Sequence, residues 1–132
     1  IPISGGRPGW ETRSGVKVIM EKLTNFEMQA ESIGLKKGDK NYYEKVTVRH
    51  ALRLTNSGEF LHSAPWSVSQ QGLSNVSHGC TGMSNASSDW VSGTMRIGDV
   101  VETTGSAKPM TMGNGYADWN LSWAAYRKGS AL

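Results

Sequence analysis

A predicted β-hairpin at residues 46–62 constrains the fold more than any other stretch of this chain. Apolar residues recur at even positions over 46–55, the two-residue period of a half-buried strand. Asn56-Ser57-Gly58 follows, and a three-residue hairpin loop favours glycine at its end, where φ is positive. Residues 59–62 form the predicted return strand. The hairpin therefore delivers His62 at the end of a sheet.

Two earlier strands are predicted at residues 16–21 and 26–31, where apolar and polar residues alternate. The intervening Leu23-Thr24-Asn25 is expected to join them as a second hairpin. After a polar loop, Tyr42 and Tyr43 enter the strand region. Adjacent strand residues face opposite ways, so we expect one ring to pack and the other to point outward.

One helix is predicted at about residues 86–95, because Ser84 or Asn85 can cap its first turn. A strand at 100–103 follows the turn signal Gly98-Asp99. The remaining chain, 105–132, is expected to be a C-terminal extension that packs on the same domain. A short helix there would lay three aromatic side chains, spaced by four and three residues, on the domain: Trp119, Trp123 and Tyr126.

The composition agrees with a single β-rich domain. A chain of 132 residues suits one domain, and its 16 glycines favour a turn-rich β protein. The net charge is only +3 and the basic residues form no dense run, so nucleic-acid binding has no support. The sequence contains no membrane-spanning apolar segment and no recognisable signal peptide. We therefore expect any targeting segment or anchor to lie upstream.

The reactive side chains are concentrated between His62 and Ser84, a stretch that includes the only cysteine, Cys80. A cysteine attacks a carbonyl as a thiolate and needs a base to take its proton. His62 and His78 are the candidate bases, and Gly79 allows backbone N–H groups to approach an oxyanion. A buried structural cysteine and a papain-like protease are alternatives, but papain-like enzymes place the cysteine before the histidine. The spacing is not a usual zinc pattern, so no metal or cofactor is predicted.

His-Ser-Ala-Pro-Trp at 62–66, followed by Ser-His-Gly-Cys at 77–80, resembles the signature of the L,D-transpeptidases. These enzymes cross-link bacterial peptidoglycan through a cysteine acyl-enzyme. The similarity extends to residues 1–15, which resemble the family's Ser/Gly-rich segment, and to Asp118-Trp119-Asn120, which resembles the C-terminal extension of actinobacterial members. Gly82 departs from the family, since many members carry Asn there. If this position merely lines the site, replacement by Asn is expected to change the rate only modestly.

The resemblance implies a mostly-β, L,D-transpeptidase-like sandwich or barrel with one short helix after the nucleophile and a C-terminal cap. It implies that residues 1–104 are the catalytic domain and that further strands of the sheet precede residue 1. It makes Cys80 the nucleophile and His62 the base, with the carbonyl of Ser63 accepting a hydrogen bond from the imidazole. The N–H groups of Gly79 and Cys80 would hold the oxyanion.

The resemblance and the motif's surroundings also suggest substrate-binding residues. Met28 would lie on a flap over the site, Tyr43 would reach the oxyanion region, and His78 would shape the loop, with base duty as its runner-up role. Ser77 is expected to hydrogen-bond within its turn and Trp66 to pack under the loop or line the substrate wall. Tyr42 is also a predicted substrate-binding residue.

The implied function is L,D-transpeptidation of peptidoglycan stem peptides on the extracytoplasmic side of a bacterial envelope. Carbapenem β-lactams are implied as covalent inhibitors. Two alternatives remain open: an L,D-carboxypeptidase that uses water as acceptor, and a non-catalytic cell-wall-binding module. A binding module would not need a thiol beside a histidine, so substitution of Cys80 separates it from an enzyme.

Overall fold

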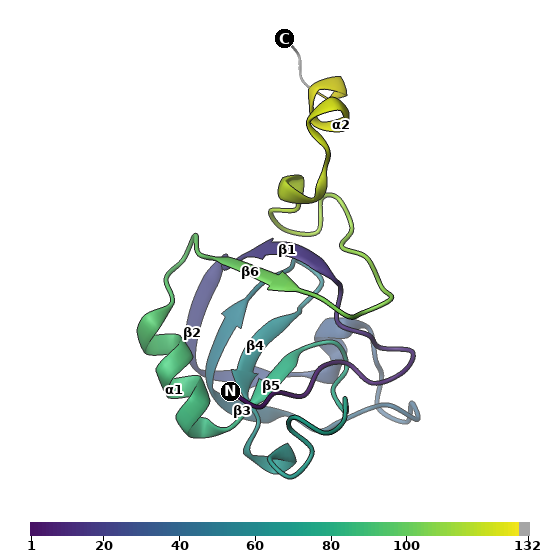
Figure 1. Ribbon diagram of the computed structural model, residues 1–132. Helices are drawn as coiled ribbons and strands as arrows, with labels where there is room; N and C mark the ends of the chain where they lie inside the picture. Colours follow the sequence, from purple (N-terminus) through teal and green to yellow (C-terminus); the bar gives the residue numbers. More distant parts are fainter. Residues whose placement is uncertain (130–132) are drawn as a thin grey trace.

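Two β-sheets form the body of the molecule in the computed structural model, which describes residues 1–129 (Figure 1). The larger sheet has the order β2-β3-β4-β5, and the smaller one pairs β1 with β6. The strands are β1 (Gly15–Val18), β2 (Glu21–Met28), β3 (Val46–Arg53), β4 (Phe60–Ser63), β5 (Thr81–Met83) and β6 (Val100–Thr103). The helices are η1 (Ala30–Ile33), η2 (Pro65–Ser67), α1 (Asn85–Thr94), η3 (Asp118–Asn120) and α2 (Trp123–Lys128). The predicted mostly-β class is confirmed.

The β3–β4 hairpin is present as predicted. Its antiparallel ladder pairs Ala51 with His62. Gly58 closes the loop with a φ of 90°, which glycine adopts without the steric penalty of a side chain. β5 then runs parallel to β4 and pairs Gly82 with His62. Because Cys80 immediately precedes β5, this parallel pairing places the cysteine segment alongside the histidine strand.

The predicted hairpin between residues 16–21 and 26–31 is wrong. β2 continues through residues 23–25 and pairs with β3, whereas β1 pairs with β6 in the other sheet. The chain changes sheets at Ile19, which is fully buried and donates its N–H to the carbonyl of Asp99 over 2.9 Å. Long-range ladders and the burial of Ile19 outweigh the local turn signal, a competition that strand periodicity alone does not reveal.

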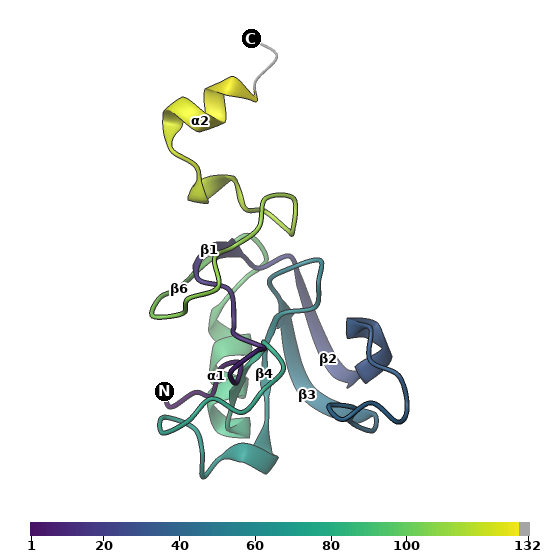
Figure 2. The ribbon, with the colours of Figure 1, turned by 90° about the vertical axis from the view of Figure 1, so that its right-hand side faces the viewer.

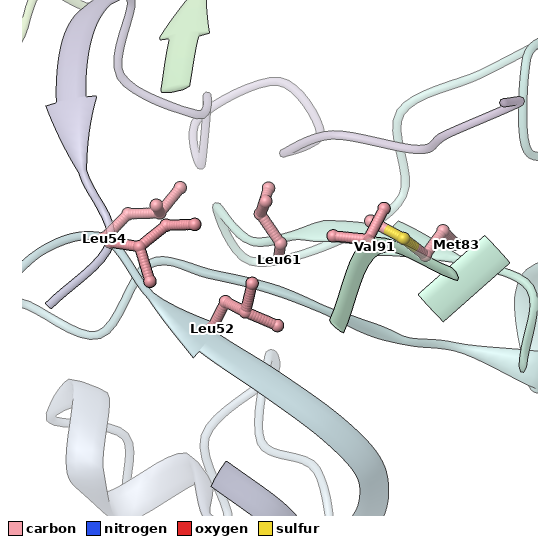
Figure 3. Close-up of a cluster of buried hydrophobic side chains, with 6 residues drawn as sticks. Leu52, Leu54, Leu61, Met83 and Val91 are labelled. Atoms are coloured by element: carbon pink, nitrogen blue, oxygen red, sulfur yellow. The ribbon is translucent and has the colours of Figure 1, made fainter. Parts of the chain in front are cut away.

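The buried apolar side chains form two clusters on opposite faces of the larger sheet. Leu61 and Phe60 are adjacent on β4, so they point to different faces. The first cluster lies between the sheet and α1 (Figure 3), and the second surrounds the cysteine. The first contains Ile19, Leu52, Leu54, Leu61, Met83 and Val91; the second contains Val48, Ala51, Phe60 and Cys80.

Helix α1 follows β5 and covers one face of the larger sheet (Figure 1). The side chain of Ser84 accepts a hydrogen bond from the N–H of Ser87 over 3.1 Å, so Ser84 is the N-cap. Arg49 and His50 of β3 both reach Asp89 on the helix, at 3.0 and 3.1 Å. Within residues 1–129, none of the helices has the length and apolar character needed to cross a membrane.

The first part of the C-terminal extension is hydrogen-bonded to the domain, and its second part projects away from it. Asn120 accepts a hydrogen bond from the N–H of Val16 over 2.7 Å and donates to the carbonyl of Val16 over 2.8 Å. Beyond it, α2 projects away from both sheets (Figure 2). The rings of Trp123 and Tyr126 stack on each other at 5.8 Å and are exposed, and both line a cavity with Val18 and Val100 of the smaller sheet.

Candidate active site

Cys80 and His62 line one cavity of about 410 Å³ on the second-cluster face of the larger sheet. The cavity wall also contains Met28 from β2, Tyr43, Trp66, Ser77 and His78. Its other apolar walls come from side chains that include Phe26, Val46 and Phe60. The structure thus brings together most of the predicted site residues. Among the described residues, Tyr42, Ser63 and Gly79 are the predicted ones that lie outside the wall.

The Cys80 thiol is buried at the floor of this cavity. It donates a hydrogen bond to the carbonyl of Gly58 over 3.4 Å and packs with Phe60. Burial raises the pKa of the thiol to about 12, because desolvation penalises the thiolate. The side chain is therefore a neutral thiol at neutral pH, and its attack on a carbonyl would require that its proton be removed.

His62 is held by the contact that the resemblance implied. Its Nδ1 lies 2.8 Å from the carbonyl oxygen of Ser63. A carbonyl oxygen only accepts, so Nδ1 carries the proton and Nε2 keeps its lone pair. Burial lowers the pKa of His62 below its ordinary value, since desolvation disfavours the imidazolium. The Trp66 ring stacks on the imidazole at 6.0 Å. The imidazole of His62 is therefore neutral at neutral pH, and its orientation is fixed.

The turn before Cys80 is closed by the hydroxyl of Ser77. This hydroxyl donates to the carbonyl of Cys80 over 2.6 Å and accepts from the N–H of Gly79 over 3.0 Å. Gly79 has a φ of 125°, a left-handed conformation that favours glycine. The predicted bonding of Ser77 within the turn is present. The N–H of Gly79, expected to face an oxyanion, is directed at Ser77 instead.

Gly82 occupies a tight position between β4 and the N-terminal segment. Its N–H and carbonyl exchange hydrogen bonds of 2.9 Å with the backbone of Ser4. A Cβ at Gly82 would lie 2.9 Å from the Cβ of Ala64 and 4.0 Å from His62 Cε1. An asparagine side chain therefore requires a shift of Ala64, the residue that follows β4.

The side chain of His78 is held in one orientation by several neighbouring residues. Its Nε2 lies 2.8 Å from Nη2 of Arg7 and 2.9 Å from the carbonyl of Asn41. His78 Nε2 can form only one of these two hydrogen bonds at a time. It accepts from Arg7 when it is unprotonated, and it donates to the Asn41 carbonyl when it is protonated. The rings of Trp10 and Tyr43 pack on it, each at 5.1 Å. Burial, and next the charge of Arg7, lower the pKa of His78.

The two adjacent tyrosines have different surroundings. Tyr43 lines the cavity, and burial raises the pKa of its phenol to about 12. Tyr42 instead donates to a carboxylate oxygen of Glu31 over 3.0 Å. This hydrogen bond raises the pKa of Tyr42. Tyr42 therefore lies away from the thiol, and Tyr43 keeps a phenolic proton that can be donated into the cavity.

Sequence reasoning missed the charged groups next to the cavity. Arg53 lines its wall, with its guanidinium 4.5 Å from the Phe60 ring centroid. Glu59 lies behind the cysteine turn and pairs with the fully buried Lys17. The alternation of apolar and polar residues assigned Lys17 to a polar face. No local signal distinguishes a buried lysine from an exposed one.

Comparison with known proteins finds similarity to one kind of enzyme. Residues 1–103 match the family model YkuD, the L,D-transpeptidase catalytic domain. L,D-transpeptidase 2 of Mycobacterium tuberculosis is 33% identical over 132 residues, covering 99% of this chain and 32% of that protein. L,D-transpeptidase 3 from M. tuberculosis, in complex with a faropenem-derived adduct, superimposes with a TM-score of 0.73 at 36% identity over 77% of this chain and 43% of that one.

A further solved structure, LD transpeptidase LdtMt1 in complex with imipenem, superimposes with a TM-score of 0.75 at 37% identity. It covers 77% of this chain, and this chain covers 47% of it. The chain spans about a third of the length of the curated relative described above.

Proposed function

The chain belongs to the L,D-transpeptidase family, and we propose that it forms peptidoglycan cross-links between diamino-acid residues of stem peptides through an acyl-enzyme on Cys80. One observation carries this proposal. Cys80 and His62 line the same cavity, and the contact between His62 Nδ1 and the Ser63 carbonyl leaves Nε2 as the basic nitrogen. A thiol and an oriented base beside one cavity are what cysteine acyl transfer requires.

The first half-reaction is acylation of Cys80 by the donor stem peptide. His62 Nε2 takes the thiol proton, and the sulfur attacks the carbonyl that links the diamino acid to the terminal D-amino acid. The tetrahedral intermediate collapses when the proton on His62 passes to the leaving amine. The D-amino acid departs, and a thioester remains on Cys80. Burial favours the neutral form of both groups, so the thiol proton has to be transferred during this half-reaction.

The second half-reaction returns the enzyme to its starting state. The side-chain amine of an acceptor stem enters the cavity, and His62 Nε2 takes one of its protons as the nitrogen attacks the thioester. The C–S bond breaks, and the proton passes to the sulfur. The products are a new amide between the two stems and a neutral thiol.

The oxyanion of both steps is assigned to the Cys80 N–H and the Tyr43 hydroxyl. The high pKa of Tyr43 keeps the phenol protonated, so it is a donor at neutral pH. Gly79 would contribute only if its N–H left Ser77. Removal of one such donor from an oxyanion hole slows catalysis by about 10²–10³-fold in other enzymes.

β-Lactams are proposed as covalent inhibitors of the same site. The lactam carbonyl stands in for the donor carbonyl, and ring opening leaves a thioester on Cys80 with the former leaving amine still attached. The relatives in complex with imipenem and with a faropenem-derived adduct support this proposal. A family that acts on the cell wall also supports an extracytoplasmic location.

The acceptor in the second step distinguishes transpeptidation from the two alternatives. The full chain would be incubated with a purified disaccharide-tetrapeptide and the products weighed by mass spectrometry. A dimer that has lost one D-amino acid supports the proposal, and a tripeptide alone indicates an L,D-carboxypeptidase. Unchanged substrate bound equally by the protein and by Cys80→Ala would indicate a wall-binding module.

A further inference from the structure

A buried group of three charges lies directly behind the cysteine turn. Lys17 of β1 is fully buried, and its Nζ lies 2.9 Å from Oε2 of Glu59. Nη1 of Arg13 lies 2.8 Å from Oε1 of the same carboxylate, and the N–H of Arg13 donates to it over 3.1 Å. These residues are called the Lys17–Glu59–Arg13 triad below. Two cations and one carboxylate leave one uncompensated positive charge.

The triad is in contact with the segments that hold Cys80. A Cβ at Gly79 would lie 3.8 Å from Cγ and 4.0 Å from Oε1 of Glu59, so this side chain lies against the turn. Glu59 is flanked in the chain by Gly58, whose carbonyl accepts from the Cys80 thiol, and by Phe60, which packs on Cys80. Backbone and side chain thus both connect the triad to the nucleophile.

Stability alone is a weak reason for such an arrangement. Burial of charges carries a desolvation penalty, and replacement of a buried ion pair by apolar residues is often neutral or stabilising. Charges near a buried thiol have a chemical consequence instead, because a cation stabilises the anion that forms when the thiol loses its proton and a carboxylate destabilises it. Glu59 raises the pKa of Cys80, and Lys17 lowers it to a smaller extent.

We propose that Lys17 and Glu59 are positioning residues that act on Cys80 with opposite signs: Lys17 stabilises the thiolate, and Glu59 holds the Lys17 ammonium beneath the turn while opposing that thiolate. This inference rests on the proposed function only in taking Cys80 as the nucleophile. The other charged and titratable groups around the cavity are Tyr43, Glu44, Arg53, His62 and His78. All of them remain in the variants below.

The test measures the rate of Cys80 alkylation by iodoacetamide across pH 6–10, using the full chain and intact-mass detection. The thiolate displaces iodide, so the rate reports the thiolate and needs no peptidoglycan. Lys17→Met should slow alkylation at pH 8 by about tenfold, because far below the thiol pKa the thiolate fraction falls tenfold for each unit by which that pKa rises. Glu59→Gln should speed alkylation, and the double variant should return toward the rate of the unsubstituted protein.

Lys17→Arg keeps the charge and should keep the profile, so the Lys17→Met and Lys17→Arg comparison decides the matter even if Glu59→Gln does not fold. Arg49→Met is the matched control, since it removes a cation paired at 3.0 Å with Asp89 at α1. Slowing by both single variants, in folded proteins, would mean a merely structural triad and overturn the proposal. Failure of the cross-linking assay, with alkylation slowed by Lys17→Met and speeded by Glu59→Gln, would count against the proposed function alone.

Discussion

The hydroxyl of Ser77 accepts a hydrogen bond from the N–H of Gly79 over 3.0 Å, within the turn that presents Cys80. The same hydroxyl donates to the carbonyl of Cys80 over 2.6 Å. One side chain therefore satisfies two backbone groups of a turn whose glycine has a φ of 125°. The geometry of the turn that holds Cys80 therefore depends on this residue.

Ser77→Ala should lower both stability and the acylation rate. It leaves the N–H of Gly79 and the carbonyl of Cys80 without their partner, and a buried group left unsatisfied costs about 1–3 kcal/mol. We expect the free energy of unfolding in urea to fall by that amount and acylation to slow by about tenfold. Ser69→Ala is the control, because the Ser69 hydroxyl bonds only on an exposed loop. Equal stabilities for the two variants would contradict this account.

Gly82→Asn should be damaging rather than mild. The new Cβ would meet the Cβ of Ala64 at 2.9 Å, closer than side-chain carbons approach in folded proteins. Relief requires a shift of Ala64, which directly follows the strand that carries His62, and overpacking of this kind typically costs about 1–3 kcal/mol. We expect reduced stability and at least about tenfold slower acylation. Gly93→Asn, where a Cβ meets open space, is the matched control.

The sequence predicted local features well and long-range ones poorly. Gly58 and the N-cap Ser84 were predictable because turn and cap chemistry is confined to a few residues. The pairing of β1 with β6 joins strands far apart in the chain, so no local pattern specifies it. Lys17 has a polar residue's position in its strand, and its burial depends on Glu59, a residue 42 positions away.

The cavity was harder to predict than the motif that marks it. His62 and Cys80 could be identified as candidate site residues because their spacing and flanking residues form a specific signature. The Gly79 N–H points toward Ser77 because of the local geometry of the turn, and a sequence motif does not specify that geometry. The partners of His78 come from Arg7 and Asn41, which the motif does not include.

Stability should decrease on both sides of neutral pH because of the buried site. The folded-state pKa of His62 is lowered, so below about 6.5 the unfolded chain takes up a proton that the folded protein resists. The folded-state pKa of Cys80 is raised to about 12, so above about 8.5 the unfolded chain releases a proton that the folded protein retains. Both effects favour the unfolded state. The His62 effect lowers stability as pH falls, and the Cys80 effect lowers stability as pH rises.

Urea unfolding at pH 5, 7.5 and 10 would check this prediction. Cys80→Ala should remove about 1–2 kcal/mol of the loss between pH 7.5 and 10, while leaving the acid side unchanged. His62→Gln should reduce the loss between pH 7.5 and pH 5. Parallel pH profiles for the protein and both variants would show that these groups do not titrate as their burial requires.

Acylation by imipenem should occur once, at Cys80, and should depend on His62. The thiol is neutral at rest, with its pKa raised to about 12, so opening of the lactam ring requires transfer of its proton to His62 Nε2. Without that base the reaction relies on the small fraction of free thiolate. His62→Ala should therefore slow acylation by about 10²–10⁴-fold, the usual effect of a lost general base. Stopped-flow rates and intact mass would measure it.

Substitutions of Cys80 itself provide a second test of acylation by imipenem. Cys80→Ala should show no adduct, and Cys80→Ser nearly none, because a hydroxyl is a far weaker nucleophile than a thiol at neutral pH. Peptide mapping of the unsubstituted protein should place one whole drug molecule on the segment that contains Cys80. Trp66→Phe keeps an aromatic ring against His62 and should retain most of the rate, which separates loss of the base from loss of its packing. A folded protein that stays unmodified under excess imipenem would contradict the assignment of Cys80 and His62 as an acylating pair.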